Sequence, residues 1–217
     1  MSYKPPYVIT PRITHLVARI SEAVGGYYAR EDLRLHRLNR IKTIQGTLAI
    51  EGNTLSTEQV TAVLEGKPVV APINEIQEVR NALKTYEMLD ELDPYKIEDL
   101  LKAHAAMEAG LIDEAGRFRK GGVGVMSGEE IIHYAPDADR VPFLMRDLFE
   151  WLNTTEEHPL IASCVFHYEF EFIHPFADGN GRTGRLWQTL ILSKWRPIFR
   201  SKTSFTSTSK SITVLSL

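Results

Sequence analysis

Twelve consecutive residues, from His174 to Arg185, combine the side chains that a phosphate-handling site requires. The run is His-Pro-Phe-Ala-Asp-Gly-Asn-Gly-Arg-Thr-Gly-Arg. Its histidine can act as a general base, its aspartate can hold a metal ion, and its two arginines can bind phosphate groups. This segment therefore predicts a site that binds a polyphosphate and moves a proton beside it.

The local sequence places this run between two helices. Residues 160–173 are strongly apolar and aromatic, which is typical of a buried helix. Pro175 is expected to end that helix because proline lacks an N–H and disfavours the helical conformation of the residue before it. His174 is therefore expected at a helix end. The apolar pattern resumes at residues 186–192, so residues 179–181 are expected to form an anion-binding turn at the start of the next helix.

Several residues in this turn are unfavourable at a helix start. Gly179 and Gly181 are expected to adopt positive φ or to allow close backbone approach. Arg182 and Arg185 each oppose the helix dipole by about 0.3–1 kcal/mol, and Gly184 costs about 1 kcal/mol more than alanine. Such a concentration of unfavourable choices is expected at a functional site. The alternative is a solvated, glycine-rich loop whose arginines are surface charges.

The same twelve residues match the signature of the Fic family, His-x-Phe-x-(Asp/Glu)-Gly-Asn-Gly-Arg-x-x-Arg, at every specified position. The chain thus resembles a family of adenylyltransferases, which transfer AMP from ATP to hydroxyl side chains of proteins. The resemblance implies that His174 is the general base, that Phe176 anchors the loop, and that Asp178 holds Mg²⁺ at the α- and β-phosphates. It implies an anion hole from the Gly-Asn-Gly run and contacts from both arginines to the β- and γ-phosphates. The implied nucleotide-binding residues are Gly179, Asn180, Gly181, Arg182, Thr183, Gly184 and Arg185.

A second motif lies far upstream. Gly52 is typical of the left-handed residue that follows a helix, so Glu51 is expected in the last helical turn, where a carboxylate opposes the dipole and favours a cation. On these grounds alone, Glu51 is equally well a surface residue. The stretch from Thr47 to Asn53 resembles the inhibitory motif of Fic proteins, (Ser/Thr)-x-x-x-Glu-(Gly/Asn). The resemblance implies that Glu51 pairs with Arg185 and prevents productive ATP binding.

Residues 121–134 break the helical pattern and predict a β-hairpin. Two runs of β-forming residues flank a short turn at 127–129. A lone hairpin has an unpaired edge, which can bind an extended peptide as an added strand. The resemblance implies that this flap positions a target segment over the active site; the alternative is a hairpin packed on the helices without a binding role. The candidate docking residues are Gly122, Val123, Gly124, Val125, His133 and Tyr134.

Helical periodicity dominates the rest of the chain. Apolar spacing predicts further helices at about residues 13–24, 35–52, 56–65, 73–89, 97–107 and 141–153. Gly25 and Gly26 are expected to end the first of them. We therefore expect an all-α fold with a small β-hairpin. The resemblance implies a helical bundle of the Fic type, as one domain over residues 1–200, in which residues 30–53 form the inhibitory helix. Residues 201–217 are rich in serine and threonine and are expected to form a disordered or extended tail.

Composition limits the classes of partner. The 217 residues carry a formal net charge of −3, which favours neither nucleic acid nor an anionic membrane. No apolar run reaches the ~18 residues of a membrane span, and the first residues do not form a secretory signal. The single cysteine, Cys164, is expected to be buried, and a lone cysteine favours the reducing cytoplasm. The oligomeric state is left open, with a homodimer among the options.

Together with the residues of the motif, the resemblance implies a protein adenylyltransferase that transfers AMP from Mg·ATP to a serine, threonine or tyrosine hydroxyl of a protein target and is inhibited by its own N-terminal helix. Two alternatives stay open. A hydrolase of the same fold would remove AMP from a protein, with Glu51 positioning water and His174 acting as the acid. A catalytically silent module would bind peptide at the hairpin edge, although it would not need His174 together with both arginines.

Overall fold

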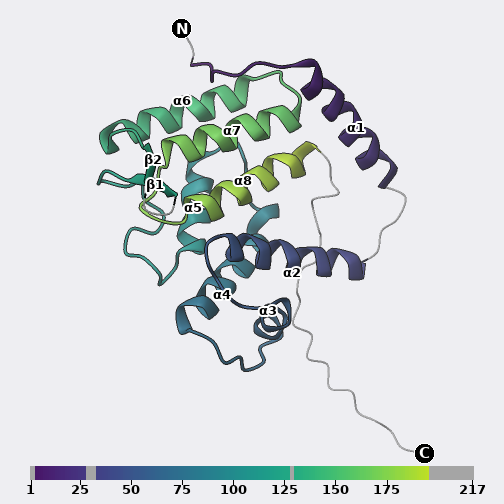
Figure 1. The fold of residues 1–217 in the computed structure, drawn as a ribbon, viewed down its shortest axis with the longest axis vertical. Coiled ribbons are helices and arrows are strands. Elements are labelled where there is room, and N and C mark those ends of the chain that lie inside the picture. The colour runs from purple at the N-terminus through teal and green to yellow at the C-terminus, as the bar shows by residue number, and fades with distance from the viewer. Residues whose placement is uncertain (1–2, 28–32, 128–129, 196–217) are drawn as a thin grey trace, which may run out of the picture.

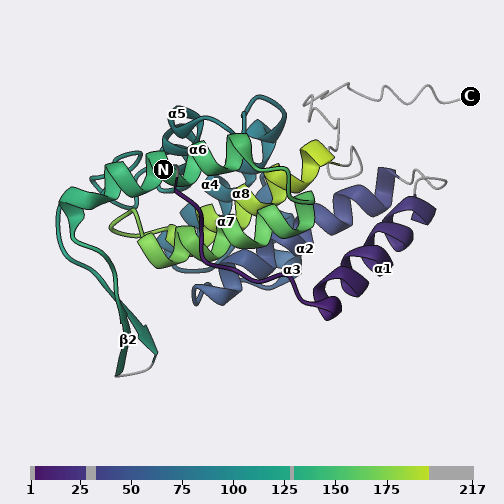
Figure 2. The ribbon, with the colours of Figure 1, turned by 90° about the horizontal axis from the view of Figure 1, so that it is seen from above.

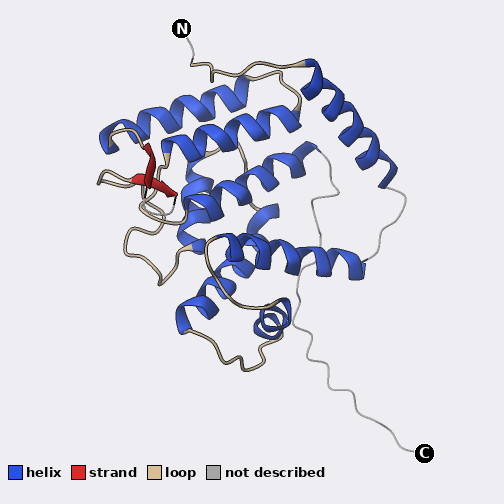
Figure 3. Ribbon diagram, in the orientation of Figure 1, coloured by secondary structure: helices blue, strands red, loops and turns tan. Residues whose placement is uncertain are grey.

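The computed structural model describes residues 3–27, 33–127 and 130–195, with the backbone alone for residues 25–27, 33–37, 124–127 and 130–133. Within these residues the chain is mostly helical, as predicted (Figure 1, Figure 3). The α-helices are α1 (Pro11–Tyr27), α2 (Leu33–Ile50), α3 (Thr57–Leu64), α4 (Ile73–Glu87), α5 (Ile97–Met107), α6 (Val141–Thr154), α7 (Pro159–Ile173) and α8 (Asn180–Trp195). Short 3-10 helices span Met88–Asp90 and Ala138–Arg140.

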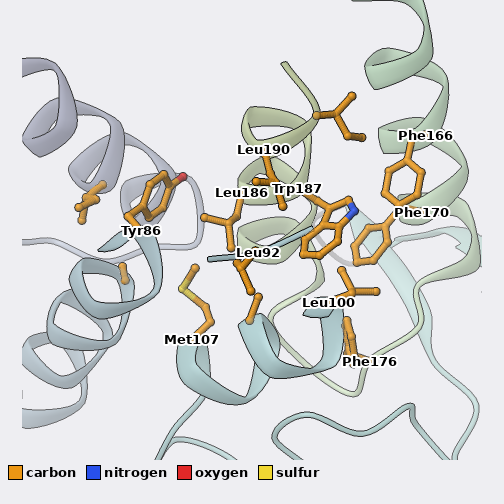
Figure 4. Close-up of a cluster of buried hydrophobic side chains, with 14 of the residues drawn as sticks. Tyr86, Leu92, Leu100, Met107, Phe166, Phe170, Phe176, Leu186, Trp187 and Leu190 are labelled. Carbon is orange, nitrogen blue, oxygen red and sulfur yellow. The ribbon is translucent and has the colours of Figure 1, made fainter. Parts of the chain in front are cut away.

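Helix α8 lies at the centre of the bundle. It packs against α7, α5 and α2, and α6 covers the other side of α7 (Figure 1). Trp187 of α8 is fully buried, and its indole N–H donates to the carbonyl of Pro94 at 3.1 Å. Figure 4 shows this core, in which Leu186, Trp187 and Leu190 lie among Phe166, Phe170, Leu100 and Met107. Because α7 and α8 are fixed by this core, the loop that joins them is held at both ends.

Local sequence signals account for several helix ends. Ser56 and Gln59 form the expected capping box at the start of α3. Helix α7 ends at Ile173, as the position of Pro175 predicts. His174 follows it in left-handed geometry with φ of 50°, whereas a residue before proline usually adopts an extended conformation. The local sequence therefore places His174 at a helix end.

The end of α2 differs slightly from the prediction. The helix stops at Ile50, so Glu51 lies in the turn after the helix and not in its last turn. Gly52 has φ of 91°, which directs the chain out of the helix, and the N–H groups of Glu51 and Gly52 bond to carbonyls three residues earlier. Of the expected inhibitory segment 30–53, residues 30–32 lie outside the described residues.

Two further expectations are wrong. Helix α1 continues through Gly25 and Gly26 to Tyr27, because glycine lowers helical stability without forbidding the conformation. Cys164 is exposed and not buried. Helix α7 is apolar around most of its circumference, so the sequence does not indicate which side faces solvent. The serine- and threonine-rich tail, residues 201–217, lies outside the described residues.

The predicted hairpin region contains two antiparallel strands, β1 (Gly124–Ser127) and β2 (Glu130–Tyr134). Gly124 pairs with Tyr134 and Val125 with His133, and the register shifts after Val125. The two strands project away from the helices (Figure 2). Residues 128 and 129 of the expected turn lie outside the described residues. No helix in the described parts of the chain is long and apolar enough to cross a bilayer.

Candidate active site

His174 lies at the junction of α7 and the loop that leads to α8. Its backbone N–H bonds to the carbonyl of Phe170 at 2.9 Å, and its side chain is 23% exposed. Its Nδ1 lies 3.3 Å from the carbonyl oxygen of Glu171. In the tautomer that donates a proton from Nδ1 to this carbonyl, Nε2 carries the lone pair and can accept a proton. The helix end thus orients an imidazole that is suited to act as a base.

The loop after His174 is anchored by buried side chains. Phe176 is fully buried and stacks on His104, with ring centroids 3.6 Å apart. Burial lowers the pKa of His104 to about 4, so the ring is neutral near pH 7. Its Nδ1 accepts from the N–H of Gly116 at 2.9 Å, and its Nε2 is 2.9 Å from the carbonyl of Asp178, to which it donates. His104 therefore acts as a core residue that fixes the loop. Its position on the otherwise apolar face of a helix favours the same role.

The side chain of Asn180 closes the loop after His174. Its side chain is buried and forms a reciprocal pair of bonds with the backbone of Phe176, accepting from its N–H and donating to its carbonyl, each at 2.9 Å. The amide side chain is thus used to close the loop, and only its backbone is available to line an anion site. Residue type alone could not distinguish these uses, because asparagine tolerates left-handed turns and also bonds to nearby backbone.

The three glycines of the motif have three different environments. Gly179 has φ of 76°, as expected, and a Cβ there would strike the carboxylate of Glu108. Gly181 is helical and not at positive φ, because α8 begins at residue 180; a Cβ there would strike Glu51. A Cβ at Gly184 would lie 2.5 Å from Oε1 of Glu171. The glycines therefore allow three carboxylates to approach the start of α8.

Arg182 lies within a group of carboxylates beneath the anion turn. Its side chain is 6% exposed and lies 3.2 Å from Glu108, 3.4 Å from Asp178 and 3.8 Å from Glu78. Burial raises the pKa of Glu108 to about 7; Arg182 lowers it, and the neighbouring carboxylates raise it further. One guanidinium therefore partly neutralises several acidic groups at the start of α8.

Arg185 is bound to the end of α2. Its Nη2 donates to Oε1 of Glu51 at 2.6 Å and to the carbonyl of Thr47 at 3.1 Å, and its Nε donates to the hydroxyl of Thr47 at 2.8 Å. Asn53 lies close by but serves another purpose, since its amide donates to Glu78 at 2.7 Å and to the carbonyl of Glu75 at 3.1 Å. The predicted pairing of Glu51 with Arg185 is therefore present, and Thr47 reinforces it.

Asp178 lies at the solvent-exposed edge of the same turn. Its carboxylate is 62% exposed, and Oδ1 accepts from the N–H of Gly179 at 2.6 Å. Among the described residues, no three histidine, cysteine or carboxylate groups are arranged to hold a metal ion by themselves. Mg²⁺ commonly binds through one or two carboxylates together with substrate phosphates, so a single exposed aspartate beside an anion turn fits that ion.

The other predicted site residues either pack against neighbouring helices or belong to the hairpin. Thr183 is fully buried, and Gly184 lies against His167 and Glu171 of α7, so both pack the start of α8. In the hairpin, the carbonyl of Val123 accepts from Ala135 at 3.2 Å, and Gly122 and Tyr134 are exposed. The side chains of Val125 and His133 lie outside the described residues.

Glu108 is a site residue that the sequence analysis missed. It is fully buried although its position after an amphipathic helix is compatible with a surface carboxylate. Glu171, for which residue type and position favour only a core or supporting role, has a carboxylate 4.0 Å from Nδ1 of His174, and burial raises its pKa to about 7. Both residues lie one helical turn from a histidine, Glu108 after His104 and Glu171 before His174. That spacing is the one signal that points to them, and it is weak.

Glu108→Gln is expected to become more stable relative to wild type as pH rises from 5 to 8. The folded protein holds the Glu108 proton up to about pH 7, whereas the unfolded chain releases it near its ordinary pKa, so this residue's contribution to stability falls across that interval. Glutamine does not titrate. Urea unfolding at both pH values should show a relative gain of about 2 kcal/mol. Glu114→Gln, at an exposed position, is the control, and an equal shift in both variants would contradict the prediction.

The chain is similar to a known protein family and to several of its members. Residues 92–192 match the family model described as Fic/DOC family. The chain is 32% identical to a protein adenylyltransferase Fic of Aedes aegypti, with 71% of this chain and 32% of that protein covered. It is 33% identical to protein adenylyltransferase fic-1 of Caenorhabditis elegans, with 74% of this chain and 33% of that protein covered. The chain thus spans about a third of the length of these curated relatives.

A solved structure is also similar. The crystal structure of a Fic family protein from Desulfovibrio desulfuricans G20 has 60% sequence identity and a TM-score of 0.87, and the match covers 91% of this chain and 62% of that one. The family model begins in the loop before α5 and ends within α8, so it contains His174, the anion turn and both arginines. The chain therefore belongs to the Fic/DOC family.

Proposed function

We propose that this chain transfers AMP from Mg·ATP to a hydroxyl side chain of a protein target. The observation that supports this most strongly is the joint placement of His174 and two arginines around one glycine turn at the start of α8. The names of the curated relatives, which are protein adenylyltransferases, agree with this proposal. We place the activity in a domain of residues 1–200, separate from the tail at 201–217, and in the reducing cytoplasm.

The phosphates of ATP would bind at the turn that opens α8. Backbone N–H groups at a helix start favour an anion, and Arg182 and Arg185 would supply charge-assisted bonds to the β- and γ-phosphates. Arg182 is already buried and fixed by its carboxylates, so it requires little reorganisation. Arg185 must first leave Glu51. The two arginines therefore divide into a fixed contact and a regulated one.

In the transfer step, His174 would be the proton acceptor. The target hydroxyl oxygen would form a bond to the α-phosphorus, the bond from that phosphorus to the bridging oxygen would break, and pyrophosphate would leave. The hydroxyl proton would pass to Nε2 of His174, while the carbonyl of Glu171 binds the Nδ1 proton and keeps the ring oriented. Bound Mg²⁺ would neutralise charge on the phosphates, and Asp178 is the residue that would hold it.

Asp178→Ala is expected to raise the Mg²⁺ concentration needed for half-maximal AMP transfer by about tenfold, because a single protein carboxylate would otherwise hold the ion. A Mg²⁺ titration of labelled AMP transfer measures this shift. Asp113→Ala, at an exposed residue outside the turn, is the matched control. Unchanged Mg²⁺ dependence in the Asp178 variant would remove this residue from the metal site.

A proline at Val123 or Val125 is expected to lower target modification by about tenfold, while ATP affinity stays within about twofold. If the target docks as an added strand, backbone groups bind it, and proline removes a donor and distorts the strand. Threonine at the same positions keeps the backbone donor and should change transfer only mildly. Labelled transfer and calorimetric ATP binding together separate the two effects. A proline variant with full transfer would exclude this docking role.

The proposed activity can be tested without knowing the target. The Glu51→Gly protein is incubated with labelled ATP and a cell lysate, and mass spectrometry searches for AMP on serine, threonine and tyrosine. His174→Ala serves as the control for background labelling. We expect modified proteins that depend on His174. If no protein carries AMP, or if labelling is equal in the control, the proposed function is wrong.

A further inference from the structure

Arg119 joins the base of the hairpin to the end of α7. Its side chain is 3% exposed and reaches four carbonyl groups. Nε donates to His174 at 2.7 Å, and Nη1 donates to Gly121 at 2.8 Å. Nη2 donates to Pro136 at 2.5 Å and to Ile173 at 3.3 Å. One side chain thus contacts the segment that enters the hairpin, the segment that leaves it, and the residue proposed as the base.

The chemistry of this contact suits arginine specifically. A planar guanidinium carries five N–H donors that diverge from one rigid centre, so it can bind carbonyls that face it from different segments. A lysine ammonium has three donors at one point and cannot span the same separation. Burial lowers the pKa of Arg119, and the nearby Asp137 opposes this effect. A buried cation is costly unless its hydrogen bonds are satisfied, and here carbonyls from both sides of the site satisfy them.

The contact also bears on the unusual backbone at His174. A residue other than glycine at φ of 50° is uncommon and must be held by its surroundings. The side chain of Arg119 binds the carbonyl of His174, and its backbone N–H donates to the carbonyl of Pro175 at 2.9 Å. The two peptide groups after His174 are therefore both fixed by the same residue.

We propose that Arg119 is a positioning residue that holds the hairpin and the backbone of His174 in one fixed arrangement. It does so by binding the two residues that flank the hairpin, Gly121 and Pro136, which we call the hairpin feet. A hydroxyl carried by a segment on the hairpin then arrives within reach of the imidazole. This inference rests on the proposed function for its consequence in catalysis. The physical clamp itself, between residues 121, 136 and 173–175, depends only on the contacts of Arg119.

The test uses three variants of the Glu51→Gly protein. Arg119→Met keeps most of the side-chain length and removes every donor. Arg119→Lys keeps the charge and can reach only part of the carbonyl set. Arg117→Met is the matched control, because Arg117 lies two residues away and is exposed. Four quantities are measured: the kcat of AMP transfer to a protein target, the Kd of ATP, the midpoint of thermal unfolding, and amide hydrogen exchange across residues 121–136.

We expect Arg119→Met to lower kcat by about tenfold or more, since misplacement of a reacting group by about 1 Å can cost a hundredfold. ATP affinity should change by less than about twofold, because the contacts of Arg119 lie outside the anion turn, and exchange across the hairpin feet should accelerate about tenfold. Arg119→Lys should recover part of both effects, and Arg117→Met should show neither.

Two results would overturn the clamp. One is a kcat and an exchange rate in Arg119→Met that match those of Arg117→Met. The other is a parallel loss of ATP affinity, thermal stability and kcat, which would reveal a general effect on folding. If no protein is modified even in the Glu51→Gly background, the proposed function fails separately. Exchange then decides alone: faster exchange at the hairpin feet in Arg119→Met supports the clamp, and unchanged exchange overturns it.

Discussion

His174→Ala is expected to lower AMP transfer by about a hundredfold to ten-thousandfold, the range that a positioned general base contributes. Nδ1 is bound to the carbonyl of Glu171, which leaves Nε2 as the proton acceptor, and alanine removes both nitrogens. ATP affinity should stay within about threefold, because the phosphate contacts come from the turn after residue 178. Labelled transfer gives the first quantity and calorimetry the second.

The backbone at His174 requires a second variant. Alanine adopts φ of 50° less readily than histidine, so a loss of activity in His174→Ala could include distortion of the loop. Asparagine tolerates left-handed geometry and cannot act as a base, so His174→Asn should lose activity to the same extent with an intact loop. His15→Ala, at an exposed position in α1, is the control. Retention of more than a few per cent of activity in His174→Asn would exclude His174 as the base.

The parts of the site that were predictable depend on short-range effects. Pro175 determines where α7 ends, and this places His174 at the helix terminus whatever the rest of the fold does. Gly52 likewise fixes the exit from α2, and the helical periods are strong enough to locate most helices. The motif itself is contiguous, so its residues must lie near one another once the local turn is known.

The features of the site that could not be predicted depend on contacts between residues far apart in the sequence. Glu108 is buried because Gly179 and Arg182, more than seventy residues away, meet it in the folded state. Gly181 lies against the carboxylate of Glu51 and has no positive φ, and nothing near Gly181 in sequence indicates this contact. Arg119 binds backbone carbonyls, which every residue has, so its partners leave no pattern of side chains to read. Residue types show that these groups are polar, but only the fold shows what they contact.

Glu51→Gly is expected to raise AMP transfer by about tenfold to a hundredfold. Glu51 accepts a 2.6 Å bond from Arg185, and a hydrogen bond to a charged group contributes about 1.5–3 kcal/mol, or roughly one to two decades. Its carboxylate would also repel a γ-phosphate at that position. Removing it frees Arg185 for the phosphate. The comparison is made with labelled ATP at equal protein concentrations.

Three further proteins show whether the gain comes from release of Arg185. Thr47→Ala removes one of the bonds that hold Arg185, at 2.8 Å, and should raise transfer by less than Glu51→Gly does. Arg185→Ala breaks the same pair but also removes the proposed phosphate contact, so it should not be activated. Glu114→Gly, an exposed carboxylate in a loop, should behave as wild type. If Glu51→Gly is no more active than Glu114→Gly, self-inhibition by α2 is excluded. If Arg185→Ala is activated, inhibition does not act by keeping the Arg185 guanidinium away from the phosphate.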